Sequence, residues 1–415
     1  MVHPAQDANL YSHEALDLTK HQVRLLALKP APGPVFPIQC DIQVFDVQNA
    51  PYYVTLSYVW GPVTPTRFVF LNGKRMPIRK NLFDFLVCFR NDASNVHFLW
   101  IDQLCIAQTH EIERNNQVRL MSRIYRRCLY VIVWLGKTSH DAALSFTTTP
   151  TEDSAYRVFH NTYFTRLWTV QEILLAPQVR VFCGPIWTSL DALVAVMRSG
   201  SHSEYPKFFD SVFGDSNIIR DPELRGLLPL ADCVRRFSKY ECSDPRDKVY
   251  GLLGLVLENQ RPVVDYNKSA EGVIADVLMI MSELHWHESK ISHNIPNTRV
   301  PTRYWLDATC LTRLAKDMGL EAQCQPISYL VEEIYEVIAV TKASGSLGFP
   351  IQAIGYSSCG GTGQWWYENK GERYCLLDFP RVPAWARRGL SLLPTGIPDR
   401  FQPHPPFHLD GTPWV

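Results

Sequence analysis

The sequence predicts an α/β protein built on a doubly wound parallel sheet flanked by helices. Three short apolar runs carry this prediction, at residues 52–61, 97–102 and 129–136. They are rich in aromatic and β-branched residues and nearly free of polar alternation, as parallel strands buried on both faces are. A helical pattern lies between the second and third runs. Strands and helices that alternate at this spacing are typical of a doubly wound sheet.

The elements before and between these runs follow from local signals. Residues 21–28 predict an edge strand, and residues 38–47 predict a second strand after a proline-rich link. The pair Asn72-Gly73 separates two extended runs and predicts a hairpin, because a type I′ turn needs positive φ at both central positions. Asn81 is expected to cap a helix with one apolar stripe.

The second run is expected to end in an acid, Asp102, and to be followed by a helix over residues 111–127. Residues 137–153 are polar and are expected to form a loop, and residues 179–184 predict a further strand. Later segments are more helical, and one of them, residues 328–342, fits either a helix or two strands. The expected later helices are at residues 190–197, 224–237 and 270–285.

Composition limits the class of protein. The chain has 415 residues, of which 46% are hydrophobic and 20% charged, which is typical of a globular protein with two or three compact units. Its 41 basic residues equal its 41 acidic ones. We therefore do not expect a nucleic-acid surface, which usually carries a basic excess.

Cysteine usage and the absence of targeting signals predict a cytoplasmic protein. The 11 cysteines are scattered, without a C-x-x-C pair, and indicate neither a disulfide framework nor a metal site. The first twenty residues lack the apolar core of a signal peptide, and no run of about twenty apolar residues occurs, so we expect no membrane association.

The stretch from Tyr163 to Glu172 is the strongest candidate for a site. Trp168 and Glu172 are four residues apart, so on a helix they would share one face. A carboxylate beside an indole is partly desolvated, which raises its pKa and suits it to acid–base or charge-stabilising chemistry. On spacing alone, a core tryptophan and a capping or ion-paired glutamate are the more common arrangement.

Several motifs together resemble the fungal heterokaryon-incompatibility (HET) domain, over roughly residues 20–290. They occur in the order of that family. They are Thr55-Leu-Ser-Tyr-Val-Trp-Gly61, Leu99-Trp-Ile-Asp-Gln-Leu-Cys-Ile-Ala-Gln108, Val133-Trp-Leu-Gly136, Arg166-Leu-Trp-Thr-Val-Gln-Glu172 and Asp244-Pro-Arg-Asp-Lys-Val-Tyr-Gly-Leu-Leu-Gly254.

HET domains are similar to TIR domains, flavodoxin-like sheets that in several lineages cleave NAD at the nicotinamide–ribose bond. The resemblance implies that Glu172 is the catalytic carboxylate, with NAD as a substrate and neither a prosthetic group nor a metal. It implies ligand contacts at the carboxyl edge of the sheet. The residues implied there are Ser57, Tyr58, Trp60, Gly61, Asp102 and Trp168.

The chain departs from the family at two positions of the loop after Asp102. Ala107 stands where the family usually has Asn, and Gln103 replaces a small residue. Because of these two changes, the resemblance does not determine which ligand contacts that loop makes.

The resemblance implies an effector of fungal non-self recognition and cell death that hydrolyses NAD(P). We expect self-association of such an effector. Two alternatives stay open: a self-associating death or signalling module without turnover, and a HET fold reused for small-molecule biosynthesis or group transfer. The expected division is a TIR-like α/β domain at residues 1–190, a helical extension at 191–290 and a mixed α+β region at 291–415, which is placed to cover the cleft.

Overall fold

The structure is a computed structural model that describes residues 9–33, 35–200, 205–214, 228–291, 306–344, 348–359 and 362–375. The chain divides into two compact units. The first consists of Met1–Leu227, Tyr240–Cys242 and Gly251–Leu255, and the second of Leu228–Lys239, Ser243–Tyr250 and Val256–Val415. The three-part division expected from the sequence, with its C-terminal cover over the cleft, stays a prediction.

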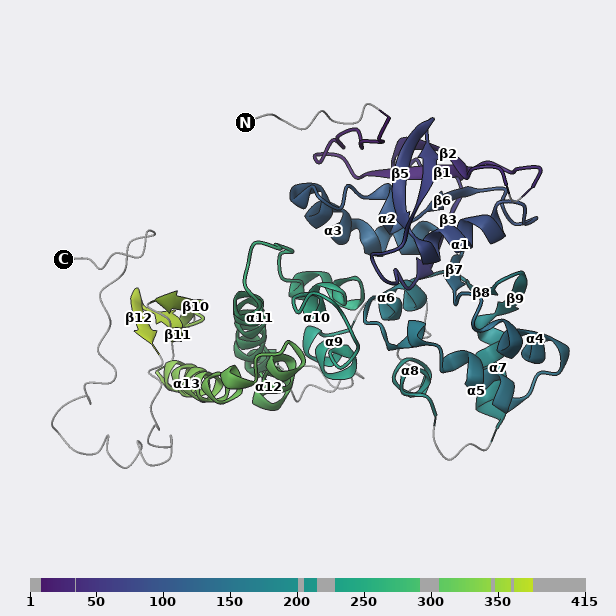
Figure 1. Cartoon of the computed structure of the whole chain (residues 1–415). Helices are drawn as coiled ribbons and strands as arrows, with labels where there is room; N and C mark the ends of the chain where they lie inside the picture. The colour runs from purple at the N-terminus through teal and green to yellow at the C-terminus, as the bar shows by residue number, and fades with distance from the viewer. Residues whose placement is uncertain are drawn as a thin grey trace, which may run out of the picture. The chain divides into compact units, whose positions relative to one another are not determined.

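The first unit is built on a nine-stranded mixed sheet in the order β5-β4-β2-β1-β6-β3-β7-β8-β9. Figure 1 shows α1–α3 packed alongside the strands, and α4, α5 and α7 grouped near β8 and β9. The strands are β1 (Gln22–Leu28), β2 (Gln39–Asp46), β3 (Tyr53–Tyr58), β4 (Thr66–Leu71), β5 (Lys74–Arg79), β6 (Phe98–Trp100), β7 (Val131–Trp134), β8 (Val179–Cys183) and β9 (Ile186–Ser189).

Seven α-helices of four or more residues accompany this sheet in the described part of the first unit. They are α1 (Lys80–Phe89), α2 (Asp102–Cys105), α3 (Glu111–Arg127), α4 (His140–Thr148), α5 (Glu152–Phe159), α6 (Trp168–Leu174) and α7 (Leu190–Ser199).

The centre of the sheet is parallel. β3 pairs in parallel with β6 on one side and with β7 on the other, and β7 pairs in parallel with β8. In chain order these four strands run 2-1-3-4 across the sheet, which is the order of flavodoxin-like folds. The predicted α/β class is therefore confirmed. In such sheets ligands bind beyond the carboxyl ends of the strands where the order reverses, here at β3 and β7.

The core of this unit follows the sequence pattern closely. All six residues of β3 and all four of β7 are buried, as expected for parallel strands covered on both faces. The apolar stripe of α1 is fully buried, and its Phe85 ring packs edge-to-face on Trp134 of β7 at 5.7 Å between centroids. The predicted hairpin is confirmed as well, since Asn72 and Gly73 have φ of 49° and 79° between β4 and β5.

The structure overturns two strand predictions. β1 is not an edge strand, because it pairs with β2 and also with β6 through Leu26 and Leu99. Its Arg24 side chain is buried in an ion pair with Glu113. The β6 strand ends at Trp100, two residues before the expected acid, because Asp102 already belongs to the first turn of α2.

Two helix predictions also need correction. The expected loop at 137–153 contains α4 and the start of α5, which begins with a capping box between Thr151 and Ser154. Its polar residues form the solvent face of short helices. Asn81 is not a helix cap; it lies inside α1, where its side chain bonds the Val59 carbonyl at 2.6 Å and the Trp134 indole at 2.9 Å.

The second unit is mainly helical and ends in a small antiparallel sheet, in the order β10-β11-β12. Residues 328–342 form one helix rather than two strands, and residues 224–227 lie outside the described part. The elements are α9 (Leu230–Phe237), α10 (Asp247–Tyr250), α11 (Ala270–Ile291), α12 (Ala308–Asp317), α13 (Cys324–Ala343), β10 (Ile351–Cys359), β11 (Thr362–Asn369) and β12 (Glu372–Cys375).

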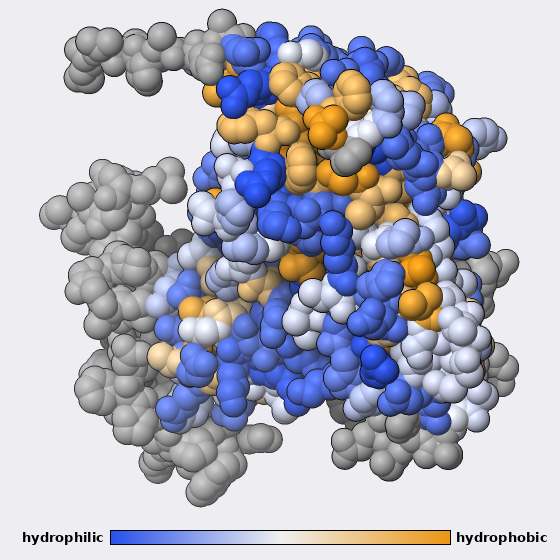
Figure 2. Space-filling model, turned by 45° about the vertical axis from the view of Figure 1, so that its right-hand side comes forward, coloured by the Kyte–Doolittle hydropathy of each residue, from blue (hydrophilic) through white to orange (hydrophobic). Residues whose placement is uncertain are grey.

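The surface is mixed in polarity. On the face that Figure 2 presents, hydrophilic residues cover much of the surface, and hydrophobic ones lie in separate groups between them. Among the described residues, no helix combines the length and the apolar character that a membrane span requires.

Candidate functional site

Glu172 of α6 contacts the end of the central strand β3 through Ser57. The Ser57 hydroxyl donates a hydrogen bond to Glu172 Oε2 and lies 2.6 Å from the Tyr163 hydroxyl. Because Ser57 has one hydroxyl proton and gives it to the carboxylate, Tyr163 is the donor to Ser57. A relay of hydroxyls therefore ends on Glu172 at the carboxyl end of the parallel sheet.

The Glu172 carboxylate is buried, with 5% of the residue exposed. Burial raises its pKa, and the charge of Arg166 and the hydrogen bond from Ser57 oppose that rise without cancelling it. The Tyr125 hydroxyl of α3 also bonds to this carboxylate. A buried carboxyl with a raised pKa, bonded by the Ser57 and Tyr125 hydroxyls, is suited to acid–base or charge-stabilising work.

The two phenols of the site, Tyr125 and Tyr163, are in the same electrostatic situation. Burial holds the pKa of Tyr125 and of Tyr163 well above their usual value, and the charge on Glu172 raises both further. Both phenols therefore stay protonated and act as donors over the physiological pH range. Ser57 is the group of the relay that lies on the sheet itself.

Asp102 forms a second part of the site with Trp60. The Trp60 indole donates to Asp102 Oδ2 at 2.7 Å, and the backbone amide of Gln103 donates to Asp102 Oδ1 at 2.7 Å. Burial raises the pKa of Asp102, while the bond from Trp60 and the charge of Arg166 act in the opposite direction. The segments after β3 and β6 are thus joined at this carboxylate.

Arg166 connects the two carboxylates. Its guanidinium donates to the backbone carbonyl of Tyr58, and its charge acts on both Glu172 and Asp102. One cation, bound to the last residue of β3, therefore favours the ionised form of both acidic groups. The Tyr58 side chain is buried and donates from its hydroxyl to Gln103 Oε1 at 3.2 Å.

The loop after β3 is fixed from the other side by Arg79. The Arg79 guanidinium donates to the Gly61 carbonyl at 2.5 Å and lies over the Trp60 ring, 4.9 Å from its centroid. Gly61 has φ of 73°, a conformation that favours glycine at this sharp turn. This pairing of arginine and indole sets the orientation of Trp60 toward Asp102.

The predicted residues therefore fall into two groups rather than one open cleft. Ser57 meets Glu172 in a buried group, while Trp60, Gly61 and Asp102 form a more accessible group at the loops. Trp168 is the first residue of α6 and is partly exposed, one turn before the buried Glu172. The sequence predicted that Trp168 and Glu172 would line one cleft together. In the structure, α6 passes from the surface at Trp168 to the interior at Glu172.

Sequence reasoning missed the groups that connect these residues: Arg166, Tyr163, Tyr125, Arg79 and Asn81. The first two belong to the same stretch as Trp168, and an arginine beside a predicted buried acid is a signal that could have been used. The others come from α1, β5 and α3, and nothing local in the sequence links them to β3.

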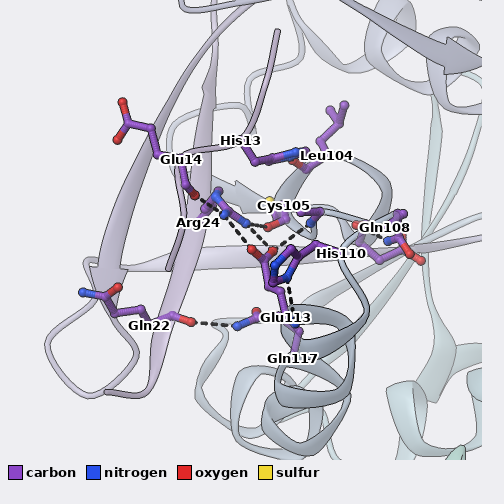
Figure 3. Close-up of polar contacts among 12 residues, drawn as sticks. His13, Glu14, Gln22, Arg24, Leu104, Cys105, Gln108, His110, Glu113 and Gln117 are labelled. Carbon is purple, nitrogen blue, oxygen red and sulfur yellow. Dashed lines mark hydrogen bonds and ion pairs between the residues drawn. The ribbon is translucent and has the colours of Figure 1, made fainter. Parts of the chain in front are cut away.

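The loop between α2 and α3 is held by a buried ion pair (Figure 3). Arg24 of β1 contacts both carboxylate oxygens of Glu113, at 2.6 and 2.9 Å, and the two side chains are 1% and 4% exposed. Glu113 Oε1 also accepts from the Ala107 amide at 2.8 Å, and Arg24 donates to the Cys105 carbonyl at 2.9 Å. This loop, which carries Ala107, is therefore fastened to β1, whereas the other departure from the family, Gln103, lies in α2.

No group of three or more His, Cys, Asp or Glu side chains that could hold a metal occurs among the residues that the structure describes. Burial raises the pKa of Cys105 and of Cys183 to about 12, so both thiols stay protonated at neutral pH.

Comparison with known proteins agrees with the motifs. Residues 53–158 match the model of the family described as Heterokaryon incompatibility protein (HET). This region runs from the start of β3 into α5 and contains Ser57, Trp60 and Asp102, whereas Glu172 lies beyond it.

The chain is also similar to heterokaryon incompatibility protein 6, OR allele, of Neurospora crassa, with 27% identity over 354 residues. The match covers 60% of this chain and 49% of that protein, so the chain spans about half the length of its relative. No solved structure matches the chain significantly.

Proposed function

We propose that this chain is an effector of heterokaryon incompatibility that hydrolyses NAD(P) at the nicotinamide–ribose bond. The observation that carries the proposal is the Glu172 carboxylate, buried and hydrogen-bonded to Ser57 at the carboxyl end of β3. That place is the ligand-binding edge of a sheet whose parallel strands run in the flavodoxin-like order.

Cleavage of the nicotinamide–ribose bond is favoured by a carboxylate near the ribose. Nicotinamide leaves as a neutral base from its cationic form, and the bond electrons go with it, so the ribose becomes an oxocarbenium-like cation. The ionised Glu172 stabilises that cation, and water then adds to the anomeric carbon and releases a proton. The products are nicotinamide and the ADP-ribose portion.

The remaining groups have supporting roles in this proposal. Ser57, fixed between Tyr163 and Glu172, keeps the carboxylate in one orientation. Trp60 offers an aromatic face near the loop, held by Arg79, against which a planar base can stack. Asp102 is held in place by the bonds from the Trp60 indole and the Gln103 amide, and these bonds oppose the rise in its pKa that burial causes. Its carboxylate oxygens can accept hydrogen bonds from ribose hydroxyls.

The test is release of nicotinamide from NAD and from NADP by the purified chain, compared with Glu172→Gln. Gln keeps the size of the side chain and removes its charge. The matched control is Glu258→Gln, which removes an exposed carboxylate of the second unit. We expect turnover in the wild type and in the control, and a loss of at least about a hundredfold in Glu172→Gln. No turnover by the wild type at high protein concentration would overturn the hydrolase.

A second candidate is a self-associating death or signalling module without turnover. The observation in its favour is the low exposure of Glu172, whose carboxylate is bonded by Ser57 and Tyr125 in the manner of a structural polar cluster. In that case Glu172→Gln leaves cell death unchanged, provided the variant folds. Induction of cell death by the wild type and by Glu172→Gln in a fungal host separates the two candidates.

A further inference from the structure

A pocket of about 440 Å³ lies beside the loop that follows Asp102. Its walls come from the N-terminal segment, from β5 and from the loop between α2 and α3. This volume is within the range of small-molecule sites. Its lining includes both positions at which the chain departs from the family, Gln103 and Ala107.

The pocket has few charged groups. The one acidic side chain in its lining is Glu113, which is paired with the Arg24 guanidinium (Figure 3). No lysine or arginine lines it; its two histidines are His13, whose pKa burial lowers, and His110. This lining favours an uncharged group over a phosphate as the part of a ligand that enters the pocket.

Two amide side chains present complementary hydrogen-bonding groups. Gln103 uses its Oε1 to accept from Tyr58, and Gln108 uses its Nε2 to donate to the Asp102 carbonyl at 2.9 Å. Within the part of the chain that the structure describes, these bonds leave the Gln103 Nε2 donor and the Gln108 Oε1 acceptor without a protein partner. Gln103 and Gln108 thus offer one donor and one acceptor beside the pocket. The pocket also has apolar walls at Leu16, Met76 and Ile106.

We propose that this pocket binds an adenine nucleoside. Adenine presents a donor at N6 and an acceptor at N7 along one edge, which match the free acceptor of Gln108 and the free donor of Gln103. Guanine presents two acceptors on the same edge, so it leaves the Gln108 oxygen unpaired. The small Ala107 leaves the space that a base needs, and a larger residue at that position closes it.

The position of Gln103 relates this pocket to the candidate active site. Gln103 lines the pocket, follows Asp102 directly and accepts a hydrogen bond from the Tyr58 hydroxyl, so it links the pocket to the residues of the candidate site. If the chain cleaves NAD, which rests on the proposed function above, the pocket holds the adenosine half of that substrate. The phosphates then lie outside it, toward Trp60 and Arg79.

The binding experiment uses adenosine with the full chain in isothermal titration calorimetry. The pocket is filled from two sides by separate variants, Ala107→Phe and Met76→Trp. The control is Ser94→Phe, which fills another pocket of about 350 Å³ between the segment at Ser94 and β8. Circular dichroism confirms that each variant folds.

We expect adenosine to bind the wild type and the control alike, and guanosine to bind at least about tenfold more weakly. Each filling variant is expected to weaken adenosine binding by at least about tenfold, since an occupied pocket cannot admit the base. No binding of adenosine at millimolar concentration, or binding that both filling variants leave unchanged, overturns the proposal.

Kinetics distinguish this proposal from the proposed hydrolase. If NAD is cleaved, Ala107→Phe raises KM and leaves kcat near the wild-type value, because the proposed pocket binds the adenosine half of the substrate and not the bond that breaks. If KM is unchanged in both filling variants, the proposal that the pocket binds adenosine is wrong, and the proposed hydrolase activity is unaffected. Adenosine binding without any cleavage supports the pocket and overturns the hydrolase.

Discussion

The hydroxyl of Ser57, on the central strand β3, donates a hydrogen bond to the buried carboxylate of Glu172 on α6. This bond joins two segments that are 115 residues apart in the chain. It fixes the orientation of the carboxylate and favours its ionised form against the effect of burial. The predictions below follow from this bond and from its neighbours.

Ser57→Ala is expected to shift the acid limb of the pH–rate profile of NAD cleavage to higher pH. The Ser57 bond lowers the pKa of Glu172, so its removal raises that pKa further and the carboxylate ionises later as pH increases. The free energy of unfolding should fall by about 1–3 kcal/mol, since a charged group loses a buried partner. A pH–rate profile with an unchanged acid limb would contradict this reading.

Glu172→Gln is expected to be more stable than the wild type at pH 8 but not in acid. The folded pKa of Glu172 is raised above the usual value of about 4.5, so the wild type loses stability as pH rises from that value through the folded pKa. The neutral variant lacks this loss, which is on the order of 1.4 kcal/mol for each unit of pKa shift. Melting temperatures at several pH values measure it. A gap between the two proteins that is largest near pH 4 would falsify the assignment.

Trp60→Phe is expected to weaken the loop site while leaving the core packed. The change removes the donor to Asp102 Oδ2, which raises the pKa of that carboxyl further, and it costs about 1–2 kcal/mol of stability. The control is Trp187→Phe, which removes a similar indole bond to Asp92, 2.9 Å long, from β9. NAD cleavage should fall in Trp60→Phe and stay unchanged in Trp187→Phe; equal loss in both would point to stability alone.

Arg24→Met is expected to destabilise the first unit by about 3–5 kcal/mol, because it leaves the buried Glu113 carboxylate without its cation. The double variant Arg24→Met/Glu113→Leu should recover most of that loss. Urea unfolding of the two single variants and the double variant gives the coupling energy. Additive losses would show that the two side chains act independently.

The same ion pair predicts an acid dependence of stability. Burial acts to raise the pKa of Glu113, but the bonds from Arg24 and the Ala107 amide outweigh it and leave the pKa lowered. The contribution of Glu113 is therefore present above its unfolded pKa and is lost as pH falls through its folded pKa. Glu113→Gln should remove this acid-dependent part of the unfolding free energy, and a variant that keeps the wild-type slope would argue against it.

Much of the fold could be predicted from local sequence. Continuous apolar runs predict the buried parallel strands β3 and β7, and the pair Asn72-Gly73 predicts its hairpin, because these features are determined by neighbouring residues. The prediction of a loop at 137–153 was wrong, because short helices with one solvent face have nearly the amino-acid composition of a loop. The position of β1 inside the sheet depends on pairing with a distant strand and had no local signal.

The sequence by itself determined the α/β class, the central strands and the candidates Ser57, Trp60, Asp102 and Glu172. Only the tertiary structure decided how these candidates group, because hydrogen bonds such as that of Ser57 with Glu172 join residues far apart in the chain. It also decided that Glu172 is buried while Trp168 is partly exposed, since a side chain's exposure depends on what packs over it. Residue spacing fixes which side chains share a helix face, and tertiary packing fixes what that face meets.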